Sequence, residues 1–152
     1  MSRKSSRGSG RRPLSKAMLL PLPAAKTRAL SLEHHLALAA IARGHGNLDL
    51  MVCLLKAVYT AFYLRDETAA GADDGSFRHA EAALSRCIGR AERGDTWVML
   101  DRDKTAIERI LVLHDEQLEC VPTHRYLRAV DLLHRFAQGE VASPIPRLST
   151  EP

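Results

Sequence analysis

The stretch NLDLMVCLLKAVYTAFYLR, residues 47–65, decides the fold of this chain. Its interior polar residues Asp49, Lys56 and Thr60 follow one another at spacings of seven and four, so a helix would gather them into one narrow stripe. The rest of that helix surface is apolar, and a helix that is apolar nearly all round is buried on most sides. We therefore predict that this segment is the central helix of an all-α protein.

Four further helices are expected around it, which gives a four- to five-helix up-and-down bundle. The first covers residues 32–43, with Ser31 as its N-cap and Gly44 as its stop. The other three cover residues 76–94, residues 103–121 and, after a Thr123 N-cap, the segment that ends at Gly139. No stretch alternates between apolar and polar residues over a length that would indicate a sheet.

A length of 152 residues supports one domain with two terminal extensions. We expect a basic, proline-containing flexible arm at residues 1–30, a helical bundle domain at residues 31–139, and a proline-containing C-terminal tail at residues 140–152. Residues 19–23, with the sequence LLPLP, should be extended, because each proline biases the residue before it away from the helical conformation. This short apolar stretch could dock as a strap across the bundle.

Charge is distributed unevenly along the chain. Eight Lys and Arg residues and no acidic residue fall in the first 28 positions, which leaves 14 basic and all 18 acidic residues for the other 124. Such a segment favours a polyanionic partner, above all nucleic acid, and the absence of interleaved aromatic residues favours contact with phosphate over base stacking. The arm residues predicted to contact phosphate are Arg3, Lys4, Arg7, Arg11, Arg12 and Lys16.

A second basic surface is formed by Arg86, Arg90 and Arg93, opposite the apolar arc of the helix predicted at residues 76–94. These arginines are a further candidate for phosphate contact, and the alternative is a solvated face balanced by Glu92. A helix-turn-helix is not expected at Gly44, since the helix that follows is the apolar one and lacks the Arg, Asn or Gln residues that read bases.

No catalytic or metal-binding motif stands out. The chain lacks a G-x-S-x-G elbow and a glycine-rich phosphate loop after a strand. His34 and His35 would point about 100° apart on a helix and cannot chelate one ion as an i, i+4 pair does. Asp131 and His134 could share an ion only with help from another helix, and His114 lies in an apolar stripe, where a hydrogen-bonded core histidine is the ordinary explanation. We expect no enzyme, no cofactor and no metal.

The cysteines and the apolar segments indicate a cytoplasmic protein. Cys53, Cys87 and Cys120 are far apart and odd in number, which is typical of thiols in a reducing compartment. The most apolar segment, residues 48–64, is short for a membrane span and carries charge, so no membrane association is expected.

Several short stretches resemble one group of proteins. They are residues 18–23 (MLLPLP), 32–38 (LEHHLAL), 54–59 (LLKAVY), 90–94 (RAERG) and 122–127 (PTHRYL). Together they are similar to small proteobacterial proteins of genomic islands and plasmids that are often labelled "Fis family transcriptional regulator". The resemblance implies a DNA-binding regulator that acts as a dimer. No helix-turn-helix of the Fis type is visible near the C-terminus, so no base-contacting residue is carried over.

These observations lead to one functional expectation and one alternative. The chain is expected to be a nucleic-acid-associated accessory or transcriptional regulatory protein of a bacterial mobile element, with DNA or a protein of the host or the element as its partner and a homodimer as its oligomeric form. The alternative is a non-enzymatic helical protein–protein interaction module.

Overall fold

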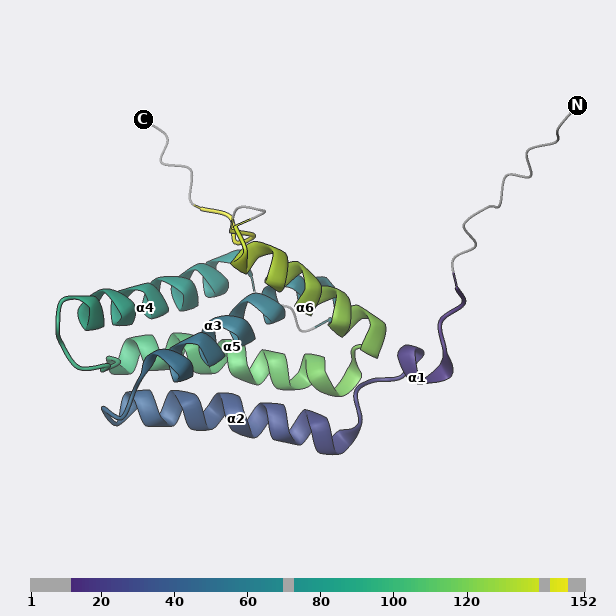
Figure 1. Ribbon diagram of the computed structural model, residues 1–152, viewed down its shortest axis with the longest axis horizontal. Helices are drawn as coiled ribbons and strands as arrows, with labels where there is room; N and C mark the ends of the chain where they lie inside the picture. Colours follow the sequence, from purple (N-terminus) through teal and green to yellow (C-terminus); the bar gives the residue numbers. More distant parts are fainter. Residues whose placement is uncertain (1–11, 70–72, 140–142, 148–152) are drawn as a thin grey trace, which may run out of the picture.

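The computed structural model describes residues 12–69, 73–139 and 143–147. Its helices are α1 (Lys16–Leu19), α2 (Ala24–Ala42), α3 (Leu48–Tyr63), the 3-10 turn η1 (Arg65–Glu67), α4 (Asp74–Glu92), α5 (Asp101–Cys120) and α6 (Thr123–Ala137). α5 lies between α2 and α4, and α3 crosses this layer in contact with α2, α4, α5 and α6 (Figure 1). The predicted all-α bundle and its central helix are confirmed.

Local signals set most of the helix ends. The side chain of Asn47 accepts a hydrogen bond of 2.9 Å from the backbone N–H of Leu50 and so caps α3. Asp73 does the same for α4 through Ser76 at 2.8 Å, which is why α4 begins at Asp74 and not at Ser76. Gly44 follows α2 with a φ of +84°, the left-handed conformation that ends a helix.

The predicted start of α2 is wrong. The helix begins at Ala24, directly after Pro23, and the expected cap Ser31 lies inside it. Residues 24–30 are mostly good helix formers, and a proline at the cap position costs no hydrogen bond because the first N–H groups of a helix have no partner in it. These residues, which we expected in the arm, form the first turns of α2, and Thr27 anchors them: its buried hydroxyl donates to the carbonyl of Leu118 in α5 at 3.3 Å.

The proline-containing stretch before α2 does lie against the bundle. The carbonyl of Leu20 accepts two hydrogen bonds from Thr123, one from its backbone N–H at 2.8 Å and one from its hydroxyl at 2.7 Å. Pro21 pairs with Pro122 in an isolated bridge, and Leu22 is buried. Thr123 thus binds the strap. It is the first residue of α6 and not its N-cap as we expected, because Pro122 occupies the cap position.

The other end of the chain also docks. Ile145 is 2% exposed and belongs to the main core, and the hydroxyl of Ser143 donates to Glu81 of α4 at 3.1 Å. The same carboxylate accepts a 2.6 Å hydrogen bond from Tyr59 of α3. Part of the expected C-terminal tail is thus an element of the packed body.

Candidate functional site

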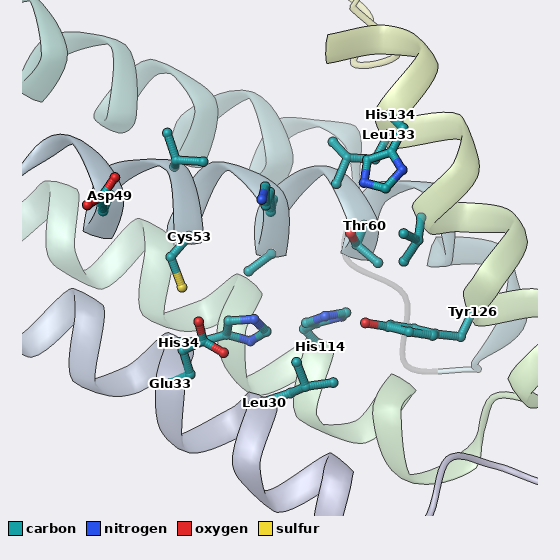
Figure 2. Close-up of a pocket in the computed structure, with 14 residues that line it drawn as sticks. Leu30, Glu33, His34, Asp49, Cys53, Thr60, His114, Tyr126, Leu133 and His134 are labelled. Atoms are coloured by element: carbon teal, nitrogen blue, oxygen red, sulfur yellow. The ribbon is translucent and has the colours of Figure 1, made fainter. Parts of the chain in front are cut away.

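A pocket of about 430 Å³ opens among α2, α3, α5 and α6 (Figure 2). Four helices contribute to its wall, so residues from 30 to 134 meet there. Its polar lining includes Glu33, His34, Asp49, Cys53, His114 and Tyr126. The spacing of residues in the sequence could not predict this pocket, because each helix supplies only a few of its lining residues.

His114 forms the buried wall of the pocket and is 2% exposed. The amide nitrogen of Gln117 donates to the carbonyl of Ala61 at 3.0 Å, which leaves the amide oxygen of Gln117 to face Nδ1 of His114 at 2.9 Å. An amide oxygen only accepts, so Nδ1 carries the proton and Nε2 is an acceptor. Burial lowers the pKa of His114 to about 4, which keeps the ring neutral near pH 7. The predicted hydrogen-bonded core histidine is confirmed.

His34 faces His114 from α2, with ring centroids 5.5 Å apart. It is 8% exposed, its Nδ1 has no hydrogen-bond partner among the residues described, and burial lowers its pKa. The neighbouring His35 points elsewhere, and its Nε2 lies 2.8 Å from a carboxylate oxygen of Asp115 in α5. The two adjacent histidines therefore diverge as predicted: His34 points toward His114 and the pocket, and His35 points toward Asp115.

The side chains that line the pocket are suited to hydrogen bonding more than to nucleophilic chemistry. Burial, assisted by the charge of Glu33, raises the pKa of the Cys53 thiol to about 11, so the thiolate nucleophile is scarce near neutral pH. The hydroxyl of Tyr126 points toward His114 (Figure 2), and burial raises its pKa. Within residues 12–69, 73–139 and 143–147, no group of three or more His, Cys, Asp and Glu side chains is arranged to hold a metal ion.

Two of the predicted arm cations can be placed. Lys16 is exposed on α1, and Arg12 is exposed just before it. α1 contacts α6. Arg3, Lys4, Arg7 and Arg11 lie outside the described residues. Further exposed cations lie in the first two turns of the helices that follow: Lys26 and Arg28 on α2, and Arg125 and Arg128 on α6. We call these four residues together with Arg12 and Lys16 the basic end.

The arginine stripe of α4 has a different environment. Arg86 lies 2.5 Å and Arg90 3.7 Å from the carboxylate of Asp103, which is 1% exposed in the first turn of α5. Arg90 also donates to the carbonyl of Val98 at 2.9 Å, whereas Arg93 is exposed at the end of α4. Two of the three arginines thus compensate a buried charge. No sequence signal singled out Asp103, because an aspartate early in a helix is common whether or not it is buried.

Comparison with known proteins finds no matching family model, no matching curated protein and no matching solved structure. The resemblance to proteins labelled as Fis regulators therefore stays a prediction. Among the described residues, no helix is long and apolar enough to cross a membrane.

Proposed function

We propose that this protein is a nucleic-acid-associated accessory protein that attaches to the phosphate backbone through its basic N-terminal segment. The observation that carries the proposal is the anchorage of that segment. Two hydrogen bonds from Thr123 to Leu20 join the segment to the start of α6, and α1 contacts α6 just before them. Arg12 and Lys16, the two arm cations that the structure describes, thereby lie in the segment that is tied to the start of α6.

The local charge supports this assignment. Residues 1–19, which we call the basic arm, carry six cations and no acidic residue, and the basic end adds four more on α2 and α6. Glu67, which lies 3.5 Å from Arg125, and Glu119, which shares a shallow hollow with Arg28, offset part of that charge. A surplus of cations at one end of the molecule favours attachment to a polyanion in one orientation.

The expected mode of binding is electrostatic and weakly selective for sequence. Each phosphate contact lowers the slope of log K against log salt by about 0.9 for duplex DNA, so six contacts from the arm would give a slope of about −5. Arg86 and Arg90 contribute little in this view, because Asp103 already compensates them.

A salt titration with full-length protein and a labelled random-sequence duplex tests the proposal. Replacing Arg11, Arg12 and Lys16 by Gln should make the slope shallower by about 3 and weaken binding. The matched control replaces Arg43, Lys104 and Arg109, three cations away from the basic end, and should leave the slope nearly unchanged. An equal loss in both variants, or an unchanged slope in the arm variant, would overturn the proposal.

A protein-interaction module is the second candidate, and one observation favours it. Leu32 and Leu36 on α2 are 60% and 59% exposed, a turn apart on the same side of the helix. Neighbouring exposed leucines of this kind often mark a contact surface.

A further inference from the structure

The outer face of α2 is apolar along most of its length. Ala25, Ala29, Leu32, Leu36 and Ala39 follow one another at spacings of four, three, four and three, which is the spacing of a coiled-coil seam. The first four of these residues are exposed, and we call them the α2 seam. The opposite side of α2 packs against α3 and α5. α2 itself is the lowest helix in Figure 1.

One flank of the seam carries two opposite charges. Lys26 and Glu33 are seven residues apart, so they lie on the same side of α2 about two turns from each other. Both are exposed, Glu33 at the rim of the pocket, and neither has an oppositely charged residue three or four positions away on the helix. Neither makes an ion pair with another residue in the described parts of the chain.

We propose that the α2 seam binds the α2 seam of a second copy of this chain, with the two helices antiparallel. A two-fold axis between Leu30 and Ser31 places Leu36 against Ala25 of the second copy, and Leu32 against its Ala29. Every layer then holds one leucine and one alanine, so the two helices keep a constant separation and the leucines fill the space above the alanines.

The same arrangement pairs the flanking charges. In antiparallel coiled coils, flanking positions of the same type face each other across the seam, which brings Lys26 of each copy to Glu33 of the other, twice by symmetry. A parallel pairing would stack leucine on leucine and alanine on alanine in uneven layers. It would also direct Glu33 toward Arg28 of the second copy instead of Lys26.

The size of the surface sets the expected strength. The seam from Ala25 to Leu36 is about 17 Å long, which places the interface at the small end of specific contacts. The dimer should therefore depend on concentration, with a dissociation constant in the micromolar range or weaker. This inference does not depend on nucleic-acid binding.

Sedimentation equilibrium of the full chain, from about 1 µM to about 500 µM, measures the association. The wild type should self-associate, and Leu36→Glu should weaken the dimer at least tenfold without loss of helical circular dichroism, since Leu36 is exposed. The matched control is Leu48→Glu on α3, where the leucine is 63% exposed, and it should associate like the wild type. A wild type that stays monomeric at the highest concentration, or a control as weak as Leu36→Glu, overturns the proposal.

Charge exchange tests the orientation. Lys26→Glu alone and Glu33→Lys alone should each be monomeric, because like charges then meet twice across the axis. A mixture of the two variants should form a heterodimer, and the double variant should regain the homodimer. Arg28→Glu should leave association unchanged. A dimer that survives Lys26→Glu but is lost in Arg28→Glu would instead show the parallel arrangement and overturn the antiparallel one.

Discussion

Burial turns His114 from an ordinarily titratable side chain into a neutral one. Loss of hydration lowers its pKa from 6.5 to about 4, against the opposing effects of the hydrogen bond to Gln117 and the charge of Asp115. The nearby His34, from α2, also disfavours the charged form. In the unfolded chain the ring takes up a proton below about pH 6.5, whereas the folded chain resists it until about pH 4. The stability contributed by the neutral ring is thus complete above pH 6.5 and is lost as the pH falls toward 4.

Replacing His114 by Asn tests this linkage. The Asn amide can still donate toward Gln117, but it does not titrate. Between pH 7 and pH 4.5, the free energy of unfolding of the wild type should fall by roughly 2 kcal/mol more than that of His114→Asn. Urea unfolding at the two pH values measures the difference. The smaller side chain lowers stability at both pH values, so the comparison concerns the change with pH, and equal changes in the two proteins would contradict the expectation.

At the scale of elements, the pair α4–α5 is joined by an ion cluster inside an otherwise apolar contact. Asp103 is buried, and Arg86 and Arg90 approach it from α4. A buried carboxylate is tolerated only when its charge is compensated. The position of Asp103 in the first turn of α5 adds the favourable interaction of an anion with a helix N-terminus.

Removal of both arginines should leave this carboxylate with only the exposed Arg102, whose Nε lies 3.8 Å away, to compensate it. We expect Arg86→Ala with Arg90→Ala to lower the free energy of unfolding by about 3 kcal/mol, measured by urea unfolding at pH 7. Arg93→Ala on the same helix is the matched control and should change it by less than about 0.5 kcal/mol. Adding Asp103→Asn to the double variant should restore part of the loss. A double variant as stable as the control would contradict the expectation and would leave Arg102 as the residue that compensates Asp103.

The helices differed in how well the sequence predicted them. The starts of α3 and α4 carry capping side chains, and the inner faces of α4 to α6 repeat at helical spacing, so these elements were predicted to within a few residues. The start of α2 was missed because its outer leucines obscure the helical period, and because Pro21 and Pro23 suggested an extended segment with no helix directly after it.

The candidate site was less predictable than the helices. His114 was recognised as a core histidine from its own apolar stripe, but its partner His34 lies 80 residues away on another helix. The ion cluster was missed for the same reason, since the depth of Asp103 depends on how α4 packs on α5. Spacing within one helix reports which residues share a face, and it does not report which residue of another helix that face meets.

At the scale of the whole molecule, the basic arm and the α2 seam are neighbours along the chain. The arm joins α2 through residues 20–23 of the strap, and the seam begins at Ala25. In the proposed antiparallel dimer, Ala24 of one copy faces residue 37 of the other, so the two arms would leave the paired helices about 20 Å apart along the axis. That span is shorter than one turn of duplex DNA, about 34 Å, so both arms could reach the same duplex.

If both proposals hold, dimerisation should raise affinity for DNA without adding any contact to the arm itself. Above the dissociation constant of the dimer, two arms with twelve cations should give a salt slope of about −11, and the Leu36→Glu variant, with its arm intact, a slope of about −5. At low salt the variant should bind at least tenfold more weakly, because the second arm no longer binds as part of the same molecule. Fluorescence anisotropy with a labelled duplex measures both quantities, and Leu48→Glu is again the control. Identical slopes for Leu36→Glu and the wild type would mean that one arm engages the duplex at a time, whatever the oligomeric state.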